Sequence, residues 1–166
     1  ASPCCSPSRA SIITGQHPAR LKLVRHIPHF REDPADIPEY HVFTKDPAQM
    51  PSRNWLPEGC PSIARALKPL GYHNLFIGKW HLGHEAHFPV HHGYDEQHGV
   101  TERGHPKSYY PPYFGKDHPV YRDVPEDQYL TDKLTDDAIA FFRRHDRGKP
   151  FQLSLFYYNV HSPHIG

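Results

Sequence analysis

A helix followed directly by an apolar strand is predicted twice in this chain, and this repeated order constrains the fold more than any other feature. The first unit covers residues 61–77 and the second covers residues 125–158. In each unit, apolar residues recur at helical spacing and then give way to the apolar run of a buried strand. Alternating helices and strands predict an α/β fold with a mostly parallel sheet. Because ligands bind at the carboxyl ends of such strands, the polar residues after both strands are expected to meet at one site.

The helix of each unit has recognisable ends. Pro69 and Gly71 end the first helix, and Gly148-Lys149-Pro150 ends the second, which follows Pro125. The apolar faces are expected to consist of Ile63, Ala66, Leu67 and Leu70 in the first helix, and of Leu130, Leu134, Ala138, Phe141 and Phe142 in the second. The apolar run over residues 151–158 favours a central strand that is covered on both faces.

A third helix is predicted near the start of the chain, over residues 8–14. Pro7 suits the first helical position and Gly15 suits the position after the last turn. We expect Ile12 and Ile13 of this helix to be buried.

Cys5 then lies at the helix N-terminus, where free N–H groups and a partial positive charge favour an anion. Arg9, one turn on, can point its guanidinium at the same place. Taken alone, a cysteine among small residues is more often a buried apolar thiol.

Long irregular loops separate the predicted elements, because the chain has 19 prolines. Residues 21–60 read as a binding loop with one possible short strand, His41-Val42-Phe43, and residues 85–124 read as loop with at most short strands. The tyrosines of 109–113 either anchor this second loop on the core or form a platform for sugar rings. The 16 histidines are expected mostly on the surface, with a minority serving as ligands or proton donors.

Composition excludes several classes of function. The net charge of +1 indicates neither a nucleic-acid partner nor an anionic membrane, and no apolar run reaches the length of a membrane span. The three cysteines do not form a disulfide framework, and bridging the adjacent Cys4 and Cys5 would be strained.

Two motifs give the chain a family resemblance. Cys5-Ser6-Pro7-Ser8-Arg9, continued by Ala-Ser-Ile-Ile-Thr-Gly, resembles the signature of type I sulfatases, in which the cysteine becomes formylglycine. Gly78-Lys79-Trp80-His81-Leu82-Gly83 is similar to the second signature, Gly-Lys-x-His-x-Gly, although alone it reads as an ordinary strand-to-loop turn. Only Cys5, not Cys4, has Pro two residues on and Arg four residues on.

A third landmark is Pro163-His164, which alone would read as a surface histidine. In sulfatases a similar strand ends in a histidine that is often preceded by Pro, and the resemblance assigns that histidine to His164. His161 is the alternative register. Lys79 and His81 are expected to face the site, with Trp80 facing away.

The resemblance implies an arylsulfatase-like hydrolase with an alkaline-phosphatase-like fold, flanked here by long Pro- and His-rich loops. The hydrated formylglycine from Cys5 would attack sulfur, form a covalent sulfo-enzyme and then expel sulfate. Arg9 and Lys79 would supply positive charge, and Lys79, His164 and His161 would contact the substrate. His81 would help to deprotonate the hydrate, and His164 would protonate the leaving oxygen.

The family also implies a divalent cation, Ca²⁺ or alternatively Mg²⁺, bound partly by the formylglycine at Cys5. The other ligands are expected outside this chain, so residues 1–166 read as part of one catalytic domain that lacks a metal-binding strand and a C-terminal part. Expected partners are a carbohydrate or aryl sulfate ester and a formylglycine-generating enzyme. The expected location is periplasmic, secreted or lysosomal.

Three alternatives stay open at this point. The first is a phosphonate or phosphodiester hydrolase of the same superfamily, and the second is a sulfatase-like binding protein whose Cys5 is never modified. The third is a histidine-rich module for transition metals, although His84, His87, His91, His92 and His98 have no compact ligand pattern.

Overall fold

A computed structural model describes residues 2–42 and 50–164. Its main elements are α1 (Cys5–Thr14), β1 (Tyr40–His41), β2 (Ser52–Arg53), α2 (Ile63–Leu67), β3 (His73–Gly78), β4 (Glu96–His98), α3 (Leu130–Arg144) and β5 (Phe151–Phe156). Short 3₁₀ helices cover Pro34–Asp36, Lys68–Leu70, Glu85–His87 and Pro89–His92. Both predicted helix-then-strand units are present, as α2 with β3 and as α3 with β5.

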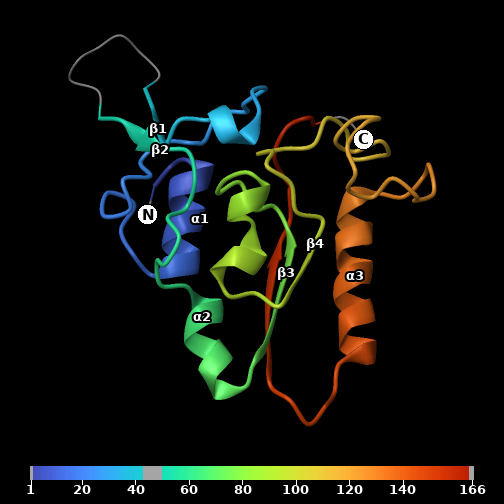
Figure 1. The fold of residues 1–166 in the computed structure, drawn as a ribbon. Coiled ribbons are helices and arrows are strands. Elements are labelled where there is room, and N and C mark those ends of the chain that lie inside the picture. Colours follow the sequence, from blue (N-terminus) through green and yellow to red (C-terminus); the bar gives the residue numbers. More distant parts are fainter. Residues whose placement is uncertain (1, 43–49, 165–166) are drawn as a thin grey trace.

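The main sheet is parallel, with the strand order β4-β3-β5. β3 and β5 pair along their whole length, from His73 opposite Phe151 to Gly78 opposite Phe156. Figure 1 shows this sheet between α3 on one side and α1 with α2 on the other. Among the described strands β3 is therefore the central one. The prediction of a central strand over residues 151–158 is not met among the described strands, where β5 lies at the edge of the three-stranded sheet.

The two faces of β3 belong to two separate apolar clusters. Phe76 packs with Ala10 and Ile13 of α1 and with Ala64 of α2. Leu75 and Ile77 pack instead with the residues of α3 that face the sheet, which are Leu130, Leu134, Ala138 and Phe141. The alternation of side chains along a strand thus connects β3 to both helical layers. Because β3 ends at Gly78, the residues that follow it lie at the carboxyl end of the sheet, between the two clusters.

Some predicted helix ends and faces differ from the structure. α1 begins at Cys5, so Pro7 is its third residue, still within the first turn where a missing N–H costs nothing. α2 gives way to a 3₁₀ turn before Pro69, and α3 begins at Leu130, after the loop that follows Pro125.

Five apolar residues expected on buried faces are exposed, namely Ile12, Ile63, Ala66, Leu70 and Phe142, and the buried residue of α2 is Ala64 instead. Ile12 lines a cavity, and the ring of Phe142 packs edge-on against Phe151, the first residue of β5.

The loops are anchored on the two cores. Tyr109 and Tyr113 are buried against the α3 face, which favours the anchoring interpretation over a sugar platform. Strand β1 covers Tyr40–His41, and Phe43 of the predicted strand lies outside the described residues. Within the described ranges, no helix is both long and apolar enough to cross a membrane.

Candidate active site

Helix α1 presents Cys5 at its first turn. Cys4 precedes the helix with an extended backbone, and no side chain in the described ranges caps this end. At the other end, Gly15 adopts a left-handed conformation (φ 69°) and closes the last turn through a bond from its N–H to the Ser11 carbonyl. The N–H groups of the first turn are therefore available to an anion beside Cys5.

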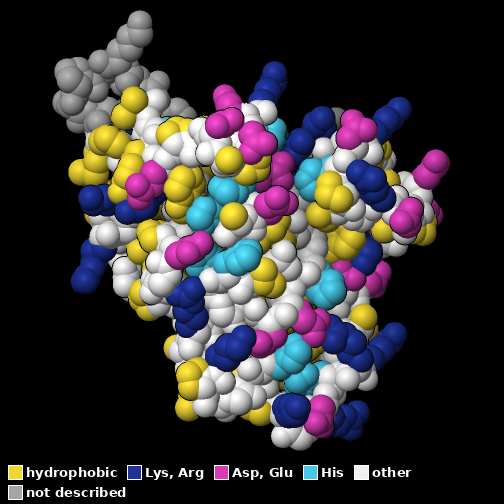
Figure 2. Space-filling view, in the orientation of Figure 1, with side chains coloured by type: hydrophobic (Ala, Val, Ile, Leu, Met, Phe, Trp, Pro, Cys, Tyr) yellow, Lys and Arg dark blue, Asp and Glu magenta, His cyan; other side chains and the backbone are white. Residues whose placement is uncertain are grey.

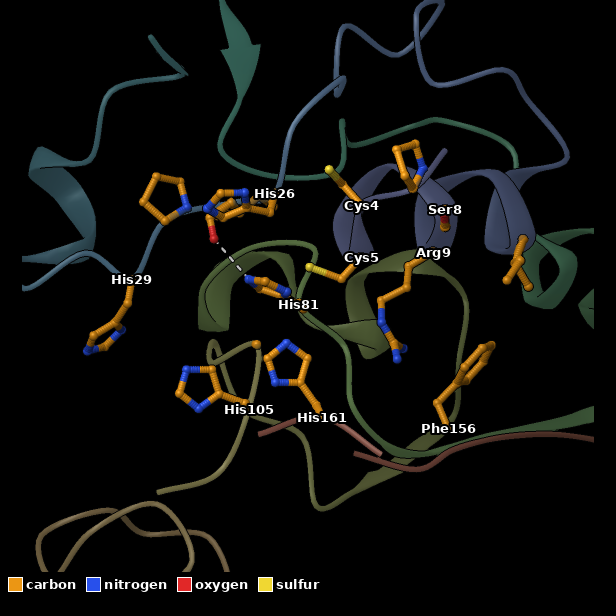
Figure 3. Close-up of a pocket in the computed structure, with 15 residues that line it drawn as sticks. Cys4, Cys5, Ser8, Arg9, His26, His29, His81, His105, Phe156 and His161 are labelled. Carbon is orange, nitrogen blue, oxygen red and sulfur yellow. Dashed lines mark hydrogen bonds between the residues drawn. The ribbon is translucent and has the colours of Figure 1, made fainter. Parts of the chain in front are cut away.

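Cys5 lines a cavity of about 950 Å³ at the carboxyl ends of β3 and β5. Figure 3 shows its thiol and the Arg9 side chain, both from α1, facing this space. The other walls come from loop 26–29, from His81 after β3, from Gly104 and His105, and from Phe156 and His161. None of the lining residues in the described part of the chain is an aspartate or glutamate. The cavity therefore suits an anionic group.

Arg9 is held at the sheet edge by two contacts. Its Nη1 donates a 2.5 Å hydrogen bond to the main-chain oxygen of Lys79. Its guanidinium carbon lies 5.2 Å from the ring centroid of Phe156, the last residue of β5. Burial lowers the pKa of Arg9 to about 10, with Tyr158 and Cys5 opposing the shift. The guanidinium is still charged at neutral pH and forms a fixed cation near Cys5.

Lys79 follows Gly78 directly, and its main-chain N–H bonds the Phe156 oxygen at 2.8 Å. The residue is only 4% exposed and is not one of those that line the cavity surface. Burial and the charge of Arg9 lower the pKa of Lys79 to about 8, while Cys5 opposes this shift. The ammonium group is thus a second, largely desolvated cation whose charge is felt at both Arg9 and Cys5.

His81 lines the cavity through a ring held in one orientation. Its Nε2 lies 2.9 Å from the Ile27 carbonyl oxygen, the dashed line in Figure 3. Because a carbonyl only accepts, Nε2 carries the proton. Nδ1 is buried and has no hydrogen-bond partner among the described residues.

Burial above all lowers the pKa of His81 to about 3. The hydrogen bond to Ile27 opposes this shift, and the charges of Lys79 and Arg9 reinforce it. The ring is therefore neutral at physiological pH, with an open lone pair on Nδ1 that can accept a proton in the site.

Trp80 lies between Lys79 and His81 in the sequence and faces away from the cavity, as predicted. It belongs to the apolar cluster that contains Phe76 and the α1 residues Ala10 and Ile13. Its ring packs edge-on against Phe76, and its Nε1 donates to the His87 oxygen at 2.8 Å.

The third landmark occupies the site through His161 rather than through His164. His161 lines both the cavity of Cys5 and a smaller cavity of about 270 Å³ beside Tyr109 and Tyr129, whereas His164 lines only the smaller one. The chain turns after the buried Tyr158, and the His161 N–H bonds the Tyr158 oxygen at 3.1 Å. This turn places position 161 over the cavity and carries position 164 past it. Of the two histidines, His161 is therefore the one that lines the cavity of Cys5.

Several lining residues were not singled out from the sequence. Residues 26–29 belong to the long loop interpreted as a binding loop, but nothing marked the Ile27 carbonyl in particular. Gly104 and His105 lie in a loop without any motif. Phe156 lies within the apolar run of residues 151–158, and its place near the end of that run was the only available signal.

The described residues do not by themselves complete a site for a divalent cation. Calcium takes six to eight oxygen ligands, yet the cavity lining contains no carboxylate. Within residues 2–42 and 50–164, no group of three or more His, Cys, Asp or Glu side chains could hold a metal ion.

Comparison with known proteins identifies the family. The Sulfatase family model matches residues 1–165. The chain belongs to the sulfatase family. It is 31% identical to human N-acetylgalactosamine-6-sulfatase over 182 residues, which is 98% of this chain and 31% of that protein. Mouse steryl-sulfatase is 36% identical over 107 residues, covering 60% of this chain and 15% of that protein.

Solved sulfatase structures share the fold. The crystal structure of Ps i-CgsB matches with a TM-score of 0.68 and 26% identity over 98% of this chain and 36% of that one. Its complex with k-i-k-neocarrahexaose matches with a TM-score of 0.67 and 25% identity, with the same coverage of both chains. These matches confirm the predicted alkaline-phosphatase-like fold. This sulfatase chain spans about a third of the length of the N-acetylgalactosamine-6-sulfatases that it matches.

Proposed function

We propose that the intact protein hydrolyses a sulfate ester on a carbohydrate. The observation that carries this proposal is the meeting of Cys5, Arg9 and His81 at one cavity without carboxylates, with the buried Lys79 next to Arg9. A sulfate ester is anionic, and its cleavage builds negative charge on the leaving oxygen. Two buried cations and the N-terminus of α1 are suited to stabilise that charge.

Cys5 is the proposed source of the nucleophile. The sequence around it matches the motif in which a formylglycine-generating enzyme replaces the thiol by an aldehyde oxygen. When hydrated, formylglycine supplies a hydroxyl that attacks sulfur and a second hydroxyl whose loss of a proton expels sulfate. The cysteine lies half-buried in the cavity at the helix N-terminus, where a small polar group of this kind fits.

Arg9, Lys79 and His81 have separate proposed roles. Arg9 holds the nucleophile and adds charge beside it, because its own position is fixed by Lys79 and Phe156. Lys79 supplies a point charge to the sulfuryl oxygens. His81 accepts a proton at Nδ1, since its Nε2 is committed to the Ile27 carbonyl.

We assign protonation of the leaving oxygen to His161, with His164 as the alternative. His161 is the histidine of this pair that lines the Cys5 cavity. A general acid has to reach the leaving group, so this placement supports His161 in the role first given to His164.

A carbohydrate substrate is supported by the names of the relatives. Human, mouse and rat N-acetylgalactosamine-6-sulfatases are among them, and a matching crystal structure holds a neocarrahexaose. A divalent cation completed by residues outside the described ranges stays a prediction from the family. So does a periplasmic, secreted or lysosomal location.

Mass spectrometry of the peptide that contains Cys4 to Arg9 tests the nucleophile. The protein should come from its native host, where an aldehyde at Cys5 and an intact thiol at Cys4 are expected. An unmodified Cys5 in the whole population would contradict the mechanism and would favour a binding protein.

Rates on an aryl sulfate and on an aryl phosphate diester test the reaction itself. The intact protein should cleave the sulfate faster, and Cys5→Ala should abolish that cleavage. Faster cleavage of the diester would instead favour the phosphodiesterase alternative.

A further inference from the structure

The ring of His161 is stacked on a second imidazole that the mechanism above does not use. The centroids of His105 and His161 lie 5.2 Å apart, and their planes differ by only 6°. His105 belongs to a loop that is remote in sequence from β5, and Figure 3 shows the two rings side by side at the cavity. We propose that His105 is a positioning residue that orients the imidazole of His161 and sets the pH range over which it can donate a proton. The catalytic part of this inference rests on the proposed function.

The backbone of His161 is fixed, but its ring has few other restraints. The Tyr109 hydroxyl donates to the His161 main-chain oxygen at 2.8 Å, and the His161 N–H bonds the Tyr158 oxygen. Nδ1 of the His161 ring lies 3.3 Å from the main-chain oxygen of Ser162 and 3.2 Å from the Oγ of the same residue. These contacts fix one edge of an otherwise exposed ring. The flat face of His105 limits the rotation of the His161 ring about its side-chain bonds.

His105 is itself held well enough to act as a wall. Its Nδ1 lies 2.9 Å from the Pro106 oxygen, so Nδ1 carries a proton and donates it to that carbonyl. The loop before it is tied down at Thr101, whose Oγ1 accepts from the Arg103 N–H at 3.1 Å. Glu102 pairs with His118 at 3.3 Å and with Arg103 at 3.2 Å. The stack therefore joins two anchored segments.

Electrostatics gives the stack a second consequence. A neutral ring face next to the His161 imidazolium is favourable, whereas a charge on His105 would repel it. The pKa of His161 is lowered first by burial, and then by the charges of Lys79, His105 and His164, while the Ser162 oxygen opposes them. Tyr109, whose hydroxyl donates to the His161 oxygen, and Tyr129, which lines the same small cavity, are further titratable groups beside this segment. Removing the charge of His105 while keeping a flat ring should raise the pKa of His161.

Two variants separate orientation from charge. His105→Phe keeps the stacked ring and removes the charge, and His105→Ala removes both. A matched control is His91→Phe, at an exposed histidine outside this cavity. The pKa of His161 should be measured by NMR in the intact protein labelled at histidine, with His161→Asn to assign its signal. In parallel, the pH profile of kcat/KM on an aryl sulfate should be recorded.

We expect His105→Phe to raise the pKa of His161 by about half to one unit, the size of one like charge at this distance in a partly hydrated site. The alkaline limb of kcat/KM should move up by the same amount at nearly unchanged maximal rate. His105→Ala should lower kcat about tenfold or more, because the acid is no longer oriented. Identical titration of His161 in the wild type and in both variants would overturn the inference. A shifted His161 titration without any sulfatase activity would overturn the proposed function alone.

Discussion

The guanidinium of Arg9 donates a hydrogen bond to the main-chain oxygen of Lys79, which lies 70 residues further along the chain. This bond joins the first helix to the residue that follows the central strand. The same guanidinium lies over Phe156, at the end of the neighbouring strand. One side chain therefore connects α1, β3 and β5 at the point where the proposed nucleophile and the buried lysine meet.

Arg9→Lys should separate this connection from simple charge. A lysine keeps the positive charge but loses the planar fork that can bond Lys79 and lie over Phe156 at once. Because a hydrogen bond from a charged group contributes about 1.5–3 kcal/mol, kcat/KM should fall roughly ten- to hundredfold. Arg20→Lys, at an exposed position, is the matched control for kinetics and for urea unfolding. Full activity in Arg9→Lys would show that charge alone is sufficient.

His81→Gln should distinguish the two nitrogens of this ring. The glutamine amide can still donate to the Ile27 oxygen, as Nε2 does, but it offers no equivalent of the Nδ1 lone pair. We expect kcat to fall about 10²- to 10⁴-fold with the free energy of unfolding nearly unchanged. His81→Ala should additionally lose roughly 1–3 kcal/mol of stability, because the buried carbonyl loses its donor. Equal stability of the two variants would contradict this assignment of the tautomer.

Gly104→Ala should disturb His81 from the opposite side. A Cβ at Gly104 would lie 2.4 Å from Cε1 of His81 and 2.7 Å from its Nδ1. The imidazole would have to move, and a displacement of this kind costs about a hundredfold in kcat. Gly148→Ala is a suitable control, because its nearest non-neighbouring atom, Asp146 Oδ1, lies 3.3 Å away on an exposed turn. Unchanged kinetics in Gly104→Ala would show that the ring position is not critical.

Gly78→Ala should weaken the junction between β3 and β5. Gly78 has φ 95°, and an added Cβ would lie only 2.1 Å from the Phe156 oxygen. Steric overlap and backbone strain together predict a loss of about 2–4 kcal/mol in urea unfolding. Gly59→Ala isolates the strain, since Gly59 has φ 76° but no atom within 4 Å of an added Cβ. A loss equal to that of Gly59→Ala, about 1–2 kcal/mol, would rule out the overlap at Phe156.

Stability should fall in mild acid because of His92. This residue is fully buried against Trp80, and burial, followed by the charges of Arg65, His87 and His91, lowers its pKa to about 4. The unfolded chain, with a histidine pKa near 6.5, therefore binds the proton first as the pH falls. Between about pH 6.5 and pH 4, His92 should lower the free energy of unfolding by up to about 1.4 kcal/mol per pH unit.

His92→Phe tests this pH dependence directly. Urea unfolding at a series of pH values should give a flatter curve for the variant than for the wild type. Substitution of the exposed neighbour, His91→Phe, should flatten the slope only slightly, because its charge is the smallest of the three that lower the pKa of His92. Parallel curves for His92→Phe and the wild type would show that this imidazole does not titrate on unfolding.

The predictions from the sequence succeeded where the signal was local. Helical spacing and apolar runs located α3, β3 and β5, and Gly15 correctly marked the end of α1. The two signatures correctly identified the family, and the rule that sites lie at strand ends predicted that Cys5 and His81 would share a cavity. These features depend on residues within one or two turns of each other, so the order of residues is sufficient to reveal them.

The tertiary structure decided which residues from separate segments actually meet. The choice between His161 and His164 depends on the turn after Tyr158, and both registers look equally polar in the sequence. The Ile27 carbonyl, Gly104 and His105 reach the cavity only because two loops fold over the end of the sheet. The sequence by itself determined the α/β order, the family and the first members of the site. Only the packing of these distant segments decided their geometry, because contacts across long loops leave no periodic pattern along the chain.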